Sequence, residues 1–176
     1  MLFGNAPCWF AIQVKSGLEL RIGSALNDKG YETFVPTYQL HEAGRVRSDR
    51  PLFSGYVFCR FDPLVRAPIV TTPGVIKVVG YGKQPASIED SEMEAVRRVA
   101  ASNLFARPHH RAAPGHRVRI AQGPLRGLDG EIARAGEHRY FVVSVSMLQR
   151  SIAVEVEPAW LELPRAEVAL AGGHIQ

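Results

Sequence analysis

The histidines are the first residues to consider for chemistry, because imidazole binds metals and moves protons near neutral pH. The chain holds six of them, dispersed except for the adjacent pair His109 and His110. No further ligands accompany the pair at a spacing that a metal site requires. The turn Gly80-Tyr81-Gly82-Lys83 has glycines and a lysine, but it lacks the helix start that offers amide hydrogens to a phosphate. We therefore predict a protein without metal or cofactor.

Other catalytic signatures are missing from the sequence as well. It contains no glycine-rich phosphate loop and no nucleophile elbow. The cysteines Cys8 and Cys59 are far apart and fit neither a metal knuckle nor a disulfide framework, so we expect two reduced thiols. We predict that the protein is not an enzyme and acts by binding.

The composition indicates a folded protein, with 46% hydrophobic and 22% charged residues. The net charge of +4 comes mainly from arginine and suits contact with nucleic acid without proving it. The first eight residues carry no basic leader, and no apolar run reaches the length that crosses a bilayer. We expect a cytoplasmic monomer that does not contact a membrane.

The segment Leu52 to Phe61 is the most apolar strand candidate. Alternation would place Tyr56, Phe58 and Arg60 on one face and Val57, Cys59 and Phe61 on the other, so both faces need a cover. Helices of the same domain could cover both faces. Alternatively, Phe53 and Tyr56 beside Gly55 could form a docking surface for another protein.

The elements around this strand predict an α+β domain over residues 1–104, in which helices flank an antiparallel sheet. Ser16 and Glu19 have the spacing of a capping box and should open a helix that ends near Gly30. The remaining expected elements are a strand at 9–14, a hairpin turning at Ala43-Gly44, a short helix at 62–71, a strand at 75–81 and a helix at 89–103.

The C-terminal part changes to short strands. Residues 105–113 contain prolines without periodicity and read as a linker. Five strand candidates then follow within residues 114–164, which suits a small closed β-barrel, and residues 165–176 read as a frayed tail. The candidates span 117–120, 130–134, 140–145, 152–156 and 160–163.

The segment Gly115 to Ile132 resembles a KOW motif, in which Val118 and Ile120 alternate inward and glycines allow a close, twisted return. Ordered motifs extend the resemblance over about Trp9 to Leu163: Trp9 to Gly17, Phe53 to Phe58, Thr72 to Val75, the KOW segment and Val143 to Arg150. This order is similar to that of NusG-family transcription elongation factors. The compact hairpin and the Leu-Gln-Arg ending look more like specialised antiterminator paralogues of the RfaH and UpxY kind.

The resemblance implies an N-terminal NGN-type domain that docks on the clamp helices of the largest RNA polymerase subunit, and an SH3-like KOW barrel. Phe53, Tyr56 and Phe58 would supply the polymerase anchor. Binding would favour processive elongation and antitermination. Lys15, Arg21, Arg66, Thr71 and Thr72 would line a face toward the non-template DNA strand, or simply form a solvated helix edge.

The loop at Met147, Leu148 and Arg150 would recruit a small-subunit ribosomal protein or the termination factor Rho. Alternatively, both apolar side chains tuck under the barrel. Leu148 departs from the aromatic residue that is common at this place in the family. The resemblance therefore supports binding to the ribosomal protein more than binding to Rho. The target operon, any pause sequence and refolding of the barrel into helices stay open, although β-branched residues favour a permanent barrel.

A KOW-containing RNA-binding protein of the ribosome is the alternative. Such a protein would be expected to carry denser lysine and arginine, because many phosphates must be neutralised. An excess of four charges favours the transcription factor.

Overall fold

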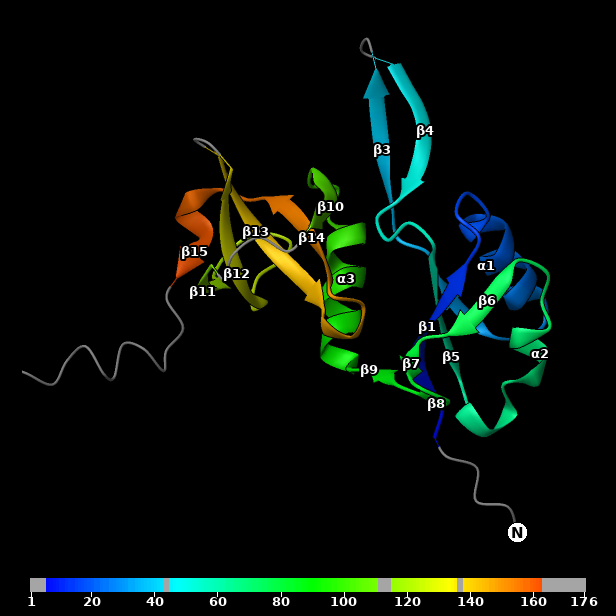
Figure 1. Ribbon diagram of the computed structural model, residues 1–176. Coiled ribbons are helices and arrows are strands. Elements are labelled where there is room, and N and C mark those ends of the chain that lie inside the picture. The colour runs from blue at the N-terminus through cyan, green and yellow to red at the C-terminus, as the bar shows by residue number, and fades with distance from the viewer. Residues whose placement is uncertain (1–5, 43–44, 111–114, 136–137, 163–176) are drawn as a thin grey trace, which may run out of the picture.

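A computed structural model describes residues 6–42, 45–110, 115–135 and 138–162. It has an N-terminal domain built on an antiparallel sheet and a C-terminal domain of strands, with helix α3 between them (Figure 1). The α+β class predicted from the sequence is confirmed. The turn at Ala43-Gly44 and the tail at 165–176 lie outside the described residues.

The N-terminal sheet has the strand order β2-β5-β1-β6, and β9 also pairs with β1. Its elements are β1 (Cys8–Val14), α1 (Glu19–Asp28), β2 (Glu32–Phe34), β5 (Tyr56–Phe61), η1 (Pro63–Val65), α2 (Ala67–Val70), β6 (Val75–Val78), β9 (Ser87–Ile88) and α3 (Asp90–Ala101). Two hairpins stand apart from the sheet: β3 (Thr37–Glu42) with β4 (Arg45–Pro51), and β7 (Gly80–Tyr81) with β8 (Gln84–Pro85).

The central strand β5 has the two apolar faces that alternation predicts. Val57, Cys59 and Phe61 belong to one hydrophobic cluster with residues of α1 and α2. Phe58 faces the opposite way, into a cluster with residues of α3. Helices of the same domain therefore cover most of both faces, as the first of the two alternatives supposed.

The strand is shorter at its start than predicted, because residues 53–55 form a turn. Gly55 has φ of +83°, a left-handed conformation that favours glycine, and the Tyr56 amide donates to the Phe53 carbonyl over 3.1 Å. The strand begins at Tyr56 for that reason.

The predicted capping box at Ser16 and Glu19 is wrong. Leu18 is the N-cap residue, without a side-chain hydrogen bond to the helix. Glu19 is buried and its carboxylate instead accepts a 2.7 Å hydrogen bond from the Gly55 amide, while the Ser16 hydroxyl pairs with that of Ser54. The residues that looked like a cap therefore join α1 to the turn before β5.

The C-terminal domain is one antiparallel sheet of order β10-β14-β13-β12-β11-β15. Its elements are β10 (Ala106–His110), β11 (His116–Ile120), β12 (Asp129–Ala135), β13 (His138–Val145), η2 (Ser146–Leu148), β14 (Arg150–Glu155), η3 (Pro158–Trp160) and β15 (Leu161–Glu162). The five predicted strands are present. Gly130 permits the close packing expected of the KOW segment, because a Cβ atom there would lie 2.5 Å from the Phe141 ring.

A sixth strand lies where the sequence predicted a linker. Residues Ala106 to His110 form β10, which pairs with β14 along its whole length. Pro108 misled the sequence argument, since proline is excluded from central strands but accepted at a sheet edge, and β10 is an edge strand. The C-terminal domain therefore begins by Ala106, within the predicted linker, rather than at residue 114.

Candidate functional site

The outer row of the N-terminal sheet carries Tyr56 on the face that α3 covers. Gln13 pairs with both Tyr56 and Lys77, so these three side chains lie side by side on that face. Tyr56 and Gln13 are half-buried and Lys77 is exposed. This row, called the outer row below, is one accessible part of the face, and the exposed pair Glu32 and Arg60 is another.

Two of the three predicted anchor residues are not on the surface. Phe53 is 1% exposed and Phe58 is 0% exposed, and their rings meet edge-on with centroids 5.2 Å apart. Both belong to the cluster that contains residues of α3. Phe53 and Phe58, predicted to contact polymerase at the surface, are therefore corrected to internal residues, because the helix of their own domain covers them. Tyr56 alone retains accessible surface.

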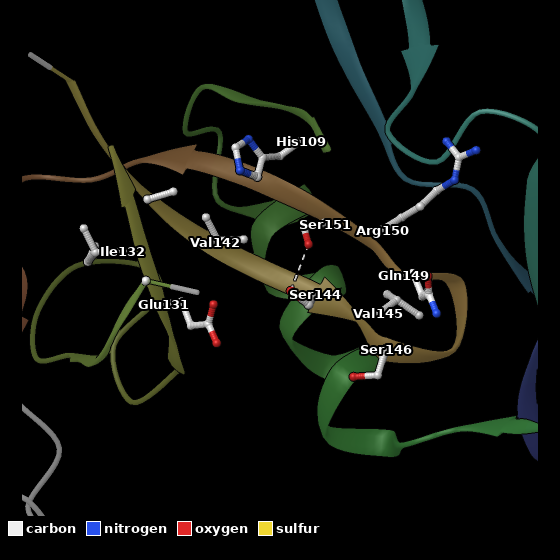
Figure 2. A pocket seen from close by; sticks show the side chains of 12 residues that line it. His109, Glu131, Ile132, Val142, Ser144, Val145, Ser146, Gln149, Arg150 and Ser151 are labelled. Carbon is white, nitrogen blue, oxygen red and sulfur yellow. Dashed lines mark hydrogen bonds between the residues drawn. The ribbon is translucent and has the colours of Figure 1, made fainter. Parts of the chain in front are cut away.

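The Tyr56 ring is contacted by the other domain. The Arg150 guanidinium, at the start of β14, lies 5.3 Å from the centre of the Tyr56 ring. In Figure 2 the Arg150 side chain points away from the other labelled residues and toward the N-terminal domain. The residue predicted to anchor polymerase and the loop predicted to recruit a partner are thus brought together.

Polar contacts from α3 complete the junction between the domains. Arg98 donates to the Pro124 carbonyl over 3.1 Å and to the Arg126 carbonyl over 2.7 Å. The Ser146 amide donates to the Glu92 carboxylate over 3.2 Å. These groups are exposed, and exposed polar pairs each contribute about 1 kcal/mol or less. The junction also has an apolar part, because Val96 of α3 and Phe141 of β13 belong to the same buried hydrophobic cluster.

The predicted recruiting loop is the short helix η2 and the residue after it. Met147 and Leu148 are both half-buried, and Leu148 packs against the hydrophobic core. Gln149 then turns the chain with φ of +50° and delivers Arg150 into β14. Neither alternative holds in full, since the two apolar side chains are neither exposed nor completely tucked under the sheet.

A cavity of about 180 Å³ opens beside this loop. Its wall includes Glu131 from β12 and the hydroxyls of Ser144 and Ser151, which lie 2.9 Å apart (Figure 2). Arg150 and Gln149 form the end of the cavity near the N-terminal domain. Arg150 thus lies between the cavity and the outer row.

The residues predicted to face DNA divide into two kinds. Lys15, Arg21, Arg66 and Thr71 are exposed. Thr72 is 4% exposed, and its hydroxyl donates to the Pro68 carbonyl over 2.9 Å. Thr72 is therefore corrected to an internal residue, because its hydroxyl is held by the Pro68 carbonyl of α2 and the Lys29 ammonium.

Lys29 also lies beside α2, although the sequence analysis did not predict it as a site residue. Its ammonium donates to the Thr72 hydroxyl over 2.7 Å and to the Pro68 carbonyl over 3.0 Å, which ties α1 to α2. Lys15 joins the same region through its amide, which donates to the Gly74 carbonyl over 2.9 Å. A lysine just beyond a helix C-terminus could have been singled out, since cations are favoured there.

No metal or nucleophile chemistry emerges in the part of the chain that the structure describes. That part holds no cluster of three or more histidine, cysteine, aspartate or glutamate side chains suited to a metal ion. Burial raises the pKa of the Cys59 thiol to about 12, which keeps it protonated and unreactive. Across the same residues, no helix combines the length and apolar character needed to span a membrane.

Comparison with known proteins gives the class to which this fold belongs. The family described as transcription termination factor nusG matches residues 7–97, more than half of the chain. The chain belongs to the NusG family. The match spans the whole sheet of the N-terminal domain and most of α3.

Relatives resemble the chain over nearly its full length. The transcription termination/antitermination protein NusG of Pasteurella multocida is 30% identical, covering 88% of this chain and 93% of its own. The protein of the same name from Vibrio vulnificus is 31% identical, over 85% and 91% of the two chains. That from Escherichia coli K12 is 28% identical, over 88% and 94%.

A solved structure supports the fold. The structure titled "Domain interaction in Thermotoga maritima NusG" matches with a TM-score of 0.57 at 21% identity, covering 89% of this chain and 96% of that one. The expected NGN-type domain followed by a C-terminal β domain is confirmed.

Proposed function

We propose that this protein is a transcription elongation factor that binds RNA polymerase through the outer row of its N-terminal sheet and promotes processive elongation and antitermination. The observation that carries the proposal is the position of Tyr56. It is a half-buried aromatic residue on a face that α3 largely covers, in a domain that belongs to the NusG family. Aromatic residues backed by a rigid core are typical binding anchors.

In this proposal Tyr56 contacts the clamp helices of the largest polymerase subunit, and Phe53 and Phe58 hold its strand in place from below. Lys77 and Gln13 extend the contact along the same row. A charged and an amide side chain beside an aromatic ring give the polar rim that protein interfaces share. Arg150 must leave Tyr56 before polymerase takes its place.

The C-terminal domain then has a role of its own. We assign Met147 and Leu148 as apolar contacts and Arg150 as a polar contact for a small-subunit ribosomal protein or Rho. Release of Arg150 from Tyr56 would free the loop for that partner. Because β10 pairs with β14, an isolated C-terminal domain for such experiments should begin near Phe105 rather than after residue 113.

The proposed DNA contact uses the exposed residues Lys15, Arg21, Arg66 and Thr71 of the N-terminal domain. Arg66 and Thr71 flank α2, Lys15 precedes α1, and Arg21 lies in the first turn of α1. Cations on one face bind phosphates through an interaction that weakens as salt rises. The non-template strand of a transcribing polymerase is the partner that we propose.

Affinity purification of the tagged full-length protein tests the proposal against the ribosomal alternative. We expect RNA polymerase subunits to copurify in stoichiometric amounts after nuclease treatment. A Tyr56→Ala variant should lose them, whereas Phe105→Ala, which alters an aromatic residue that is 55% exposed elsewhere, should retain them. Recovery of ribosomes in place of polymerase would favour the RNA-binding alternative.

A further inference from the structure

The turn between β7 and β8 presents an aromatic side chain that no part of the proposed function uses. Tyr81 is 76% exposed at the end of a two-stranded hairpin. A single exposed aromatic residue is ordinary, so the residues around Tyr81 decide whether it marks a site. Its surroundings give it significance.

A hydrogen bond joins this turn to the segment before α2. The Arg66 guanidinium donates to the Lys83 carbonyl over 3.0 Å. The two residues that precede Arg66 are Leu64 and Val65, which are 74% and 57% exposed. Three exposed apolar side chains and two cations thus come from two segments that this hydrogen bond holds together.

The cations continue from this place along α2. Lys29 reaches the Pro68 carbonyl, two residues after Arg66, and Lys15 lies beside Gly74 at the far end of the segment. Asp62 is the only acidic residue between positions 62 and 83, and its carboxylate accepts the Leu64 amide over 2.9 Å. The result is a row of positive charges that ends at Tyr81.

A succession of cations from several segments that meet along α2 complements a chain of phosphates, whereas a protein partner is typically met by a ring of charges around an apolar centre. Aromatic rings at such a track serve as platforms on which unpaired bases stack. Duplex DNA does not offer its base faces, so the complementary ligand is single-stranded.

We propose that Tyr81 stacks on an unpaired base of single-stranded DNA whose phosphates are held by Arg66 and Lys83. The inference rests on the proposed function, because it extends the DNA contacts assigned there to a residue that contacts a base. Leu64 and Val65 provide apolar surface beside the stacked base. The strand then runs along α2 toward Lys29 and Lys15.

Titration of the full-length protein with a fluorescein-labelled oligothymidylate of about twelve nucleotides at low salt tests the inference. Tyr81→Ala should weaken binding about five-fold or more, and Tyr81→Phe should bind like the wild type because the ring is kept. Arg66→Ala should weaken binding and reduce its salt dependence. Phe105→Ala and Arg139→Ala serve as the matched aromatic and cationic controls, and both should bind normally.

Binding of Tyr81→Ala within two-fold of the wild type would overturn the inference, and so would a wild-type protein that does not bind the oligonucleotide. Tighter binding of an oligouridylate of the same length would overturn the assignment to DNA. Polymerase binding, measured in parallel, separates this inference from the proposed function. If Tyr81→Ala loses oligonucleotide binding and the wild type does not bind polymerase, the proposed function is rejected and the inference about Tyr81 stands.

Discussion

The guanidinium of Arg150 lies 5.3 Å from the centre of the Tyr56 ring, and these residues belong to different domains. A cation over an aromatic face at an exposed site contributes about 0.5–1 kcal/mol. The contact covers a half-buried aromatic residue of the sheet face described above. It therefore favours the arrangement in which that face is closed.

Replacing Arg150 tests the closed arrangement. Arg150→Ala should increase the affinity for purified RNA polymerase about two- to five-fold, because the contact that competes with polymerase is lost. Fluorescence anisotropy of a labelled full-length protein measures the change. Arg139→Ala, which alters an exposed arginine of β13, is the matched control. An unchanged or lower affinity of Arg150→Ala would show that the arginine does not compete.

Replacing Tyr56 tests the polymerase surface itself. Tyr56→Ala should weaken polymerase binding by about 2 kcal/mol, or about thirty-fold, if the ring is an interface anchor. The substitution also removes the contact with Arg150, so it should be measured in the Arg150→Ala background as well. The loss should be larger there, since the offsetting gain is already present. Wild-type affinity in both backgrounds would mean that polymerase binds elsewhere.

The neighbouring threonines give a matched pair for stability. Thr72→Val keeps the shape of a buried side chain but leaves the Lys29 ammonium and the Pro68 carbonyl without the hydroxyl between them. We expect a loss of about 0.5–1.5 kcal/mol in the free energy of unfolding, since the Lys29 ammonium still reaches the Pro68 carbonyl. Thr71→Val, at an exposed position, should cost less than about 0.5 kcal/mol. Urea unfolding followed by circular dichroism measures both, and equal losses would contradict the internal role of Thr72.

The Glu32 carboxylate gives a pH dependence of known sign. A 2.6 Å hydrogen bond from Arg97 holds its pKa below the ordinary 4.5, with smaller contributions from the charges of Arg97 and Arg60. A lowered folded-state pKa stabilises the protein above the unfolded value, and this stabilisation is lost as pH falls through the folded value. The Glu32 side chain is 47% exposed, so we expect less than about 1 kcal/mol.

Urea unfolding at pH 7 and at about pH 3 measures the Glu32 contribution. Glu32→Gln should be less stable than the wild type at pH 7, and the two should approach each other at the acidic pH. A difference that stays constant between the two pH values would assign the effect to something other than the charge of Glu32.

The sequence predicted the fold well wherever local periodicity carried the information. Alternation along β5 placed Val57 and Phe58 on opposite faces, and the strands of the C-terminal domain followed their β-branched residues. It failed where an isolated local motif had another use. Ser16 and Glu19 have cap spacing, yet Glu19 bonds to an amide 36 residues away.

The candidate site was less predictable, because exposure depends on which elements pack together. Aromatic content alone does not separate Tyr56, which is accessible, from Phe58, which α3 covers. The same holds for Thr71 and Thr72, adjacent residues of one type with opposite burial. The contact between Arg150 and Tyr56 joins residues 94 positions apart, and no sequence pattern indicates it.

The position of Arg150 makes the proposed binding events thermodynamically linked. The guanidinium can lie on Tyr56 or at a partner of the C-terminal domain, but not at both. A protein that captures this arginine therefore raises the affinity for polymerase, and polymerase raises the affinity for that protein by the same factor. A cation–π contact of about 1 kcal/mol bounds the arginine's share of this reciprocal effect at about five-fold. Positive cooperativity of this size would assemble the ternary complex at concentrations where each pair alone is only partly formed.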